Sequence, residues 1–462
     1  MGGHDDPMAA DRRTLVIAAV AMVALIAIGV VSSALFTASA CEAIEPAPVE
    51  PTGYGTAVDG ALEQAFSDLD QPGRDRMAAT VESLSGQLGS VSAVHVLPDV
   101  AGLAATGIGV VATGPTTAVV DGVGPATAVD VGEAAVVGDG AALYGLALEN
   151  PLTGQVDALQ PVATGTAEGG ALEGLTCQDT ATVGTPLAFH LGAGGGELAL
   201  LRADEDGEDA ILELRDPVDG RVWAAPLELG RAPAGVQGAR LTAGLGDDVV
   251  VTGYRADPDA AGLPVLAGFD RADGAARWTL TRDHLDAAVS DDRPDRIEVV
   301  AVGSELAVVE VQAEDLDAPR DPAATEPATT GPRTLVGVDP ATGELRFVEE
   351  LADGTDLADV LVDGRRALVA FGVDDGTRVV ELGEQADGVP HELAVADARL
   401  ARSDDGTVVV VGDRGVSLLA DGRVDTVASE QPATAVLADE DTTTIVFGEP
   451  DGGGVVVVVF GG

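Results

Sequence analysis

Short apolar runs alternate with turn residues along almost the whole chain from Val91 onward. Runs rich in Val, Ala and Leu are separated by pairs such as DG, GD, GP and GG. Apolar runs of this kind, bounded by glycine and proline turns, are typical of β-strands rather than of helices. The pattern therefore predicts an all-β domain over residues 91–462.

One hairpin pattern recurs within this region. Its clearest copy, Arg333–Glu350, reads RTLVGVDPATGELRFVEE, in which two β-rich runs meet at a Pro-x-Thr-Gly turn. Further copies are Asn150–Val156 (NPLTGQV), Asp216–Trp223 (DPVDGRVW) and Asp270–Trp278 (DRADGAARW). A recurring hairpin indicates a repeat architecture. The residues shared by the last three copies in chain order are an aspartate, a glycine and an aromatic: Asp216, Gly220 and Trp223; Asp270, Gly274 and Trp278; Asp339, Gly343 and Phe347.

The strands group into units of about four, as expected for the blades of a β-propeller. We predict seven blades, over residues 125–163, 184–230, 238–282, 295–350, 357–396, 397–428 and 431–462. The last unit lacks an outer strand, and the strands within 91–120 have no complete unit of their own. Pairing these two sets would close the ring and remove its free edges. If residues 101–123 instead form a blade, the count is eight.

The N-terminal region has a different pattern. Residues 1–13 are polar and end in Arg12-Arg13, and residues 14–40 contain an uncharged apolar run, Leu15–Phe36, long enough as a helix to cross a hydrocarbon core of ~30 Å. We predict a transmembrane helix or signal anchor here. The arginine pair places the N-terminus in the cytoplasm and everything after Cys41 outside the cell membrane. Ala38-Ser39-Ala40 matches a signal-peptidase cleavage pattern, so the alternative is a signal peptide that is cleaved off.

A linker and a helical segment follow. Residues 41–55, rich in Pro and Glu, predict an extended linker. Residues 56–90 carry apolar stripes at helical spacing, interrupted at Gln71-Pro72-Gly73. We expect these helices to pack on the domain, with binding of a partner as the alternative. Residues 164–183 predict an irregular insertion and residues 313–331 a flexible loop.

Charge and cysteine content exclude several classes of protein. Acidic residues outnumber basic ones 77 to 25, the net charge is −52, and every basic residue is arginine. The chain therefore lacks the lysine of a P-loop and the basic surface that nucleic acid requires. So acidic a surface suits a halophilic habitat. Cys41 and Cys177 could form a disulfide, Cys41 could be lipidated, or both could be unrelated thiols; two cysteines exclude zinc, haem and iron–sulfur motifs.

The hairpin D-P-x-T/D-G-x-x-x-W/F resembles the repeat of the quinoprotein-like (pyrroloquinoline-quinone-repeat) β-propellers, whose units carry "ALDaxTGkxlW". The resemblance covers about residues 125–462 and implies that the glycine makes the turn between outer strands. It also implies that Trp223, Trp278 and Phe347 pack between adjacent blades. Enzymes of this family hold a quinone against an adjacent-cysteine disulfide, and no Cys-Cys pair occurs here. We therefore expect the non-enzymatic type, without a cofactor.

Candidate chemistry is sparse. Asp204, Asp206 and Asp209 precede and follow a glycine turn at a spacing that could bind calcium, although the interpretation as a solvated acidic turn is the simpler one. The five histidines show no metal-binding or catalytic spacing. We expect a membrane-anchored, extracytoplasmic scaffold or sensor that binds envelope or surface proteins, without catalysis. The alternative is a propeller-fold hydrolase or lyase that uses acidic residues, with or without calcium. The sequence leaves the oligomeric state open.

Overall fold

The computed structural model divides the chain into two compact units, Met1–Ala43 and Ile44–Gly462. All described residues belong to the second unit. The structure does not describe residues 1–46, 50–52, 55–57, 107–108, 115–116, 121–125, 130–135, 138–141, 150–155, 165–185, 192–197, 204–209, 217–219, 228–240, 247, 255–263, 287–293, 314–332, 353–354, 374–375, 385–389, 404–405, 421, 439–440, 450–452 and 462.

The described residues of the second unit form eight antiparallel sheets. Five contain strands that follow one another in the order of the chain: β11 (Pro186–Leu191), β12 (Leu198–Ala203), β13 (Ala210–Asp216) and β14 (Gly220–Leu227); β15 (Leu241–Leu245), β16 (Val249–Tyr254), β17 (Pro264–Asp270) and β18 (Ala276–Thr281); β19 (Pro294–Val302), β20 (Ala307–Ala313), β21 (Arg333–Val338) and β22 (Leu345–Leu351); β23 (Asp356–Asp363), β24 (Arg366–Val373), β25 (Gly376–Gly383) and β26 (His391–Leu393); β27 (Arg399–Arg402), β28 (Val408–Gly412), β29 (Gly415–Ala420) and β30 (Arg423–Ala428).

The other three sheets lie near the two ends of the second unit's sequence. One contains β8 (Val136–Val137), β9 (Ala142–Glu149) and β10 (Val156–Thr164). The next contains β4 (Gly102–Thr106), β5 (Gly109–Thr113), β6 (Thr117–Val120) and β7 (Ala126–Val129), extended by β1 (Ala47–Val49). The last, which we call the closing blade, contains β31 (Ala433–Ala438), β32 (Thr442–Phe447), β33 (Gly453–Gly461), β3 (Val91–Val100) and β2 (Gly53–Tyr54).

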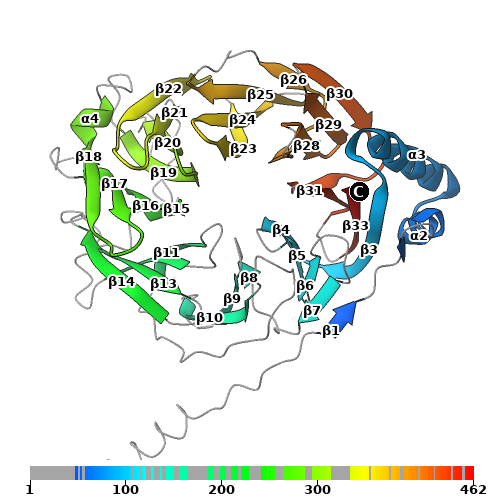
Figure 1. Ribbon diagram of the computed structural model, residues 1–462, viewed down its shortest axis with the longest axis horizontal. Coiled ribbons are helices and arrows are strands. Elements are labelled where there is room, and N and C mark those ends of the chain that lie inside the picture. The colour runs from blue at the N-terminus through cyan, green and yellow to red at the C-terminus, as the bar shows by residue number, and fades with distance from the viewer. Residues whose placement is uncertain are drawn as a thin grey trace, which may run out of the picture. The chain divides into compact units, whose positions relative to one another are not determined.

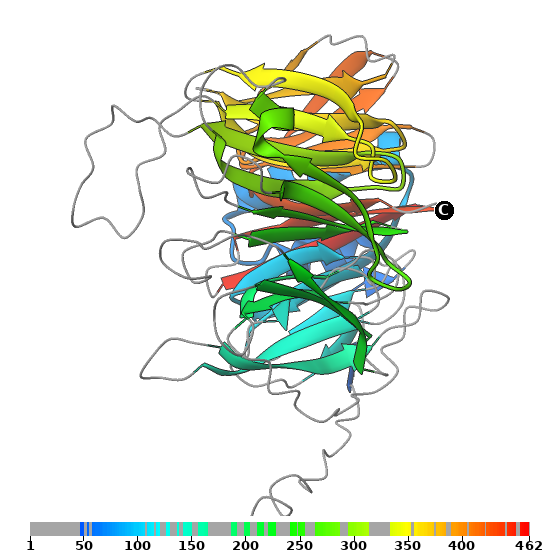
Figure 2. The ribbon, with the colours of Figure 1, turned by 90° about the vertical axis from the view of Figure 1, so that its left-hand side faces the viewer.

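The sheets follow one another around a central axis, as Figures 1 and 2 show. The first strand of a sheet contacts the first strand of the next, from β11 through β15, β19, β23 and β27 to β31, and β31 contacts β4. Four-stranded antiparallel sheets in a radial repeat are the blades of a β-propeller. The predicted fold class is therefore confirmed as an all-β propeller. The described part of the chain has eight sheets, one more than the preferred count of seven. The extra sheet is formed by residues 102–129, in agreement with the alternative count of eight.

Strands from the two ends of the propeller sequence pair in the closing blade. Strand β3 lies antiparallel to β33, with Val94 opposite Val458 and Leu97 opposite Val455. Ser92 Oγ adds a hydrogen bond of 2.8 Å to the carbonyl of Gly461. This is the pairing that the leftover strands predicted, and it supplies the outer strand that the last unit lacks.

The segment predicted as a linker also takes part in the sheets. Within residues 41–55, β1 pairs with β7 and β2 pairs with β3. Each adds a fifth strand to the outer edge of its blade. Composition alone predicts extended backbone here, and the extended backbone is used to cover two sheet edges.

Two helices precede β3. Helix α2 covers Val58–Ala65 and helix α3 covers Gln71–Leu88. The predicted interruption at Gln71-Pro72-Gly73 is instead the first turn of helix α3. Asp70 caps this helix by accepting a hydrogen bond of 2.8 Å from the amide of Gly73, and proline is compatible with the first turn. A short helix that the sequence pattern did not indicate, α4 (Arg282–Asp286), follows β18.

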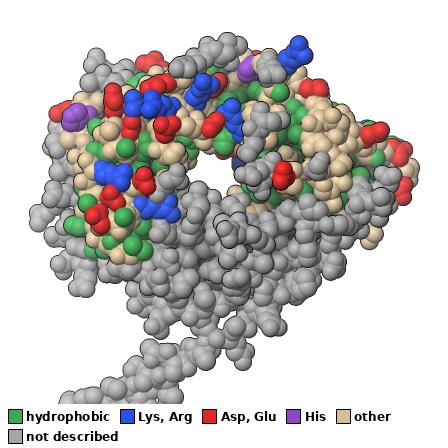
Figure 3. Space-filling model, viewed as in Figure 1, with side chains coloured by type: hydrophobic (Ala, Val, Ile, Leu, Met, Phe, Trp, Pro, Cys, Tyr) green, Lys and Arg blue, Asp and Glu red, His purple; other side chains and the backbone are tan. Residues whose placement is uncertain are grey.

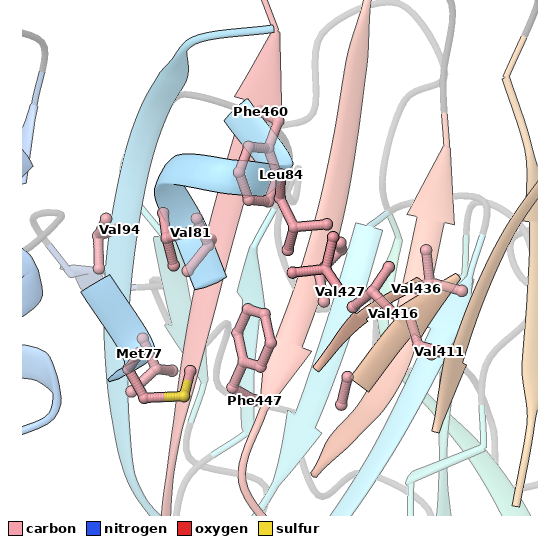
Figure 4. Packing of buried hydrophobic residues seen from close by; sticks show 14 of the residues in the cluster. Met77, Val81, Leu84, Val94, Val411, Val416, Val427, Val436, Phe447 and Phe460 are labelled. Carbon is pink, nitrogen blue, oxygen red and sulfur yellow. The ribbon is translucent and has the colours of Figure 1, made fainter. Parts of the chain in front are cut away.

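The helices pack on the closing blade and its neighbour, blade β27–β30. Figure 4 shows Met77, Val81 and Leu84 of α3 facing Phe447 and Phe460. All five of these side chains are buried, and they share a cluster with Val416 and Val427 of blade β27–β30. The apolar stripe of α3 therefore packs on the domain core, as its spacing predicted.

Among the described residues, no helix is long and apolar enough to span a membrane. The predicted transmembrane helix, residues 14–40, lies outside the described residues, as do Cys41 and Cys177. The predicted insertion, residues 164–183, is described only at Thr164, the last residue of β10. The predicted flexible loop, residues 313–331, is described only at Ala313, the last residue of β20.

Candidate functional site

The repeated turn has a defined geometry, seen most fully at Asp339–Gly343. The Asp339 carboxylate accepts hydrogen bonds from the amides of Ala341 (2.9 Å) and Thr342 (3.1 Å), and the amide of Gly343 donates to the carbonyl of Asp339 (2.8 Å). Gly343 has φ +75°, which favours glycine. Burial alone would raise the pKa of Asp339, but hydrogen bonds from Arg346 and these amides outweigh it and lower the pKa.

Each tryptophan packs on the repeated turn of the next blade. Trp278 Nε1 donates a hydrogen bond of 2.8 Å to the carbonyl of Pro340, and a Cβ atom at Gly343 would lie 2.8 Å from the Trp278 ring. Trp223 Nε1 donates in the same way to the carbonyl of Arg271 (2.7 Å), beside Gly274 at φ +73°. Both tryptophans thus lie between blades, the position that the family resemblance implies for them.

The aromatic of each hairpin also covers a glycine on the neighbouring strand. Gly268 lies opposite Trp278 and Gly337 opposite Phe347, and a Cβ atom at either glycine would come within 2.4 Å of the ring. The repeat pattern did not indicate these glycines, although both stand two positions before the repeat aspartate. Nor did it indicate Arg346 and its counterpart Arg277, each one position before the aromatic, which pair with the repeat aspartate of their own turn.

In the first of the three hairpins, the structure places Asp216 and Gly220 opposite each other at the β13–β14 turn, and Trp223 opposite Leu214. The three hairpins share a register shift just before the turn. These residues therefore form the repeat framework, and the chemistry of the molecule has to be sought elsewhere.

A polar cavity of about 560 Å³ opens between blades β19–β22 and β23–β26. It lies toward the end of the strands where β23 begins, because its lining includes Leu357–Val360 of β23. Its polar side chains come from three strands of the first blade and from β23 of the second: Glu298, Glu310, Gln312, Arg333 and Asp359.

An ion pair forms one wall of the cavity. Arg333 Nε lies 2.6 Å from a carboxylate oxygen of Glu310, and the two side chains are 25% and 11% exposed. Arg333 Nη1 also donates a hydrogen bond of 2.8 Å to the carbonyl of Thr355 and lies 3.6 Å from the exposed carboxylate of Asp356. The hydrogen bond to Glu310 raises the pKa of Arg333, so this guanidinium stays charged.

Asp359 lies at the border of three blades. Its carboxylate accepts hydrogen bonds from its neighbour Val360 (2.9 Å) and from the amide of Leu400 in blade β27–β30 (2.7 Å). Burial raises the pKa of Asp359 despite these two hydrogen bonds. A carboxyl group in this setting exchanges its proton closer to neutral pH than an exposed aspartate does.

The predicted metal-binding candidates Asp204, Asp206 and Asp209 lie outside the described residues. Within the part of the chain that the structure describes, no group of three or more His, Cys, Asp or Glu side chains has the geometry to hold a metal ion. Of the histidines, His95 is buried in β3.

No protein-family model matches the chain. No curated protein matches it. Solved structures similar to it include BamB from Moraxella catarrhalis (14% identity, 71% of this chain and 96% of that chain, TM-score 0.33). Others are the β-propeller domain of the Trilobed protease from Pyrococcus furiosus (9%, 79% and 94%, TM-score 0.37) and Kuenenia stuttgartiensis hydrazine synthase (11%, 79% and 96%, TM-score 0.36). The β-propeller assignment rests on the strand order and register described above.

Proposed function

We propose that this protein is a non-enzymatic scaffold of the cell envelope, anchored to the membrane through residues 14–40, whose propeller binds a protein partner. The observation that carries the proposal is the cavity between blades β19–β22 and β23–β26. A recess in which charged and polar side chains from two blades converge is a candidate binding site. Rigid propeller strands hold those groups in place.

The charges of the cavity indicate the kind of partner group it receives. Among the described residues that line it, three carboxylates, Glu298, Glu310 and Asp359, accompany the guanidinium of Arg333, and Asp356 adds a carboxylate beside Arg333. Sheltered carboxylates in excess attract a cation. The chain's net charge of −52 also steers basic partners toward the molecule at long range. We therefore expect an arginine or lysine side chain of the partner to enter the cavity.

The test is crosslinking on intact cells followed by recovery of the tagged protein. Glu298→Gln removes a cavity carboxylate, and Glu349→Gln, on the exposed part of β22 in the same blade, is the matched control. We expect the wild type and the control to recover the same crosslinked partner and Glu298→Gln to recover less of it. Recovery of the bait alone by the wild type, or equal recovery by both variants, would contradict the proposal.

A hydrolase or lyase is the second candidate, and the raised pKa of Asp359 inside a polar cavity favours it. A carboxyl group that keeps its proton closer to neutral pH can act as a general acid. Turnover of a substrate by the wild type that disappears in Asp359→Asn, together with the absence of a crosslinked partner, would favour this candidate over the scaffold.

The membrane anchor has its own test. Deletion of residues 1–40 should release the protein from the membrane fraction of lysed cells. A deleted chain that still sediments with membranes would show that another part of the protein holds it there.

A further inference from the structure

A second recess lies at the opposite ends of the strands that line the cavity. Strand β23 runs from the cavity, at Leu357–Val360, to Asp363, which lines a groove of about 480 Å³. The described residues that line this groove, here called the arginine groove, are all charged: Glu305, Asp363, Arg365, Arg366, Glu384 and Arg402. They come from three successive blades, and Figure 3 looks onto this face, where basic side chains lie beside acidic ones.

Ion pairs hold these arginines across the blade borders. Arg365 lies between Glu305 of the preceding blade (3.4 Å) and Glu384 of its own (3.2 Å). Arg402, from the following blade, pairs with Asp363. Arg366 pairs with Glu381 at 2.9 Å. These ion pairs bring the three guanidinium groups together at the groove.

Most donor groups of these arginines are still available. Arg365 uses Nε and Nη1 in its ion pairs, and Arg366 and Arg402 each use Nη1 alone. A guanidinium carries further N–H donors in a planar fork that matches a carboxylate. The side chains of Arg365 and Arg366 are 52% and 42% exposed, so these donors are accessible from the groove.

The groove lies where the repeat changes. In two blades in succession, a tryptophan covers the glycine turn of the next blade. The aspartate–glycine–aromatic pattern does not recur in the sequence of blade β23–β26, and Phe347, the last aromatic of the series, packs against the apolar cluster that includes Leu382. Arg346, beside Phe347, reaches Glu384 at 3.5 Å at the rim of the groove. Glu305 and Arg365 stand in turns between strands, and turns held by a rigid scaffold often carry binding residues.

The local charge is unlike that of the chain. Carboxylates exceed arginines 77 to 25 over the whole sequence, whereas the groove lining has three of each. Exposed ion pairs of this kind add little to stability, so their arginines can exchange one carboxylate for another at little loss. We propose that the arginine groove binds an acidic segment of a partner protein, with Arg365 and Arg366 as the main contacts. This interaction is independent of the cavity and of the scaffold proposal.

The test is binding of a fluorescently labelled hexaglutamate peptide to the full chain, at about 0.1 M salt, where a Debye length of about 10 Å screens repulsion from distant carboxylates. The variant is the double substitution Arg365→Gln and Arg366→Gln. The matched control is Arg378→Gln, which removes an exposed arginine from the same blade at the opposite end of its strands, where it pairs with Glu392.

We expect the wild type and Arg378→Gln to bind the peptide with equal affinity and the double variant to bind it at least about tenfold more weakly, because the two substitutions remove both guanidinium groups that contact the peptide carboxylates. A urea unfolding curve checks that the double variant is folded. Three results would overturn the proposal: no binding by the wild type, equal binding by the folded double variant, or displacement of the peptide by inorganic phosphate at the same concentration as by unlabelled peptide.

The outcomes also separate this inference from the scaffold proposal. Loss of peptide binding in the double variant, with the crosslinked partner still recovered, supports the groove and leaves the cavity unaffected. Loss of the crosslinked partner only in Glu298→Gln assigns that partner to the cavity. The two proposals can therefore fail separately.

Discussion

Substitution of Gly343 by alanine tests whether the packing between blades depends on a bare backbone at the repeated turn. Two effects act against the added methyl group. Gly343 has φ +75°, and a left-handed conformation costs a residue with a Cβ atom about 1–2 kcal/mol. The Cβ atom would also lie 2.8 Å from the ring of Trp278, closer than side-chain carbons approach one another.

The structure provides a control that separates these effects. Gly422, in the turn before β30, has φ +71°, but a Cβ atom there would meet nothing within 4 Å. Gly422→Ala should therefore show the backbone effect alone, about 1–2 kcal/mol of lost stability. Gly343→Ala should add the effect of overpacking, about 1–3 kcal/mol, so that the free energy of unfolding falls by about 2–5 kcal/mol in total.

Urea unfolding followed by circular dichroism measures the loss of stability in both variants. Tryptophan emission tests whether the additional loss in Gly343→Ala arises at the contact with Trp278. The chain has two tryptophans, so in a Trp223→Phe background Trp278 is the only reporter. Gly343→Ala should shift its emission to longer wavelength in the folded protein, because the ring must leave its buried site and its hydrogen bond to Pro340. If Gly343→Ala is no more destabilising than Gly422→Ala and the emission does not move, the account of the blade contact is wrong.

Three further predictions follow from burial, backbone and titration. Met77→Ala removes a fully buried side chain that α3 packs on the closing blade, and it should lower the free energy of unfolding by about 2–5 kcal/mol in a urea titration. Gly86→Ala, at a position in α3 where a Cβ atom meets nothing within 4 Å, should raise the free energy of unfolding by about 0.4–1 kcal/mol, and a loss would contradict the helical geometry. Burial raises the pKa of the Asp359 carboxyl group in the folded protein above the ordinary aspartate value of about 3.9. Between these two pKa values the carboxyl group is protonated in the folded state and ionised in the unfolded state. The free energy of unfolding therefore falls as pH rises through this range. The stability of Asp359→Asn relative to the wild type should therefore increase from low pH toward neutral pH, and a difference that stays constant would show that Asp359 titrates normally.

The repeat pattern predicted much of the fold because its information is local. A glycine between two β-rich runs specifies a hairpin, and four such hairpins specify a ring of sheets. The pairing of β3 with β33 was also predicted from the sequence, because the last unit lacked an outer strand and residues 91–120 contained strands without a complete unit of their own. The preferred count of seven blades was too low by one, and the alternative of eight matches the structure; β6 and β7 are only four residues long and rich in small residues, which makes their sheet hard to separate from irregular chain.

The cavity and the arginine groove could not be predicted from the sequence. Glu298, Glu310, Arg333 and Asp359 each stand in an ordinary strand, and only the packing of two blades brings them together. The same is true of Arg365 and Arg402, which belong to different blades. A site assembled from separate repeats has no short sequence motif. The turn aspartates do have one, because each accepts hydrogen bonds from backbone amides only two or three residues away.

The closing blade has a consequence for the order in which this protein folds during synthesis. Strand β3 and the helices that pack with it are made early, but Ser90 contacts Gly461 across a sequence separation of 371 residues. Translation at about 5–20 residues per second leaves β3 waiting for tens of seconds before β33 exists. During that interval the face of α3 that carries Met77 and Leu84, and the edge of β3, are without their final partners. A chaperone that acts on the nascent chain should therefore bind first at residues 58–100. In a nascent chain stalled on the ribosome before the last blade is made, the same segment should be sensitive to protease.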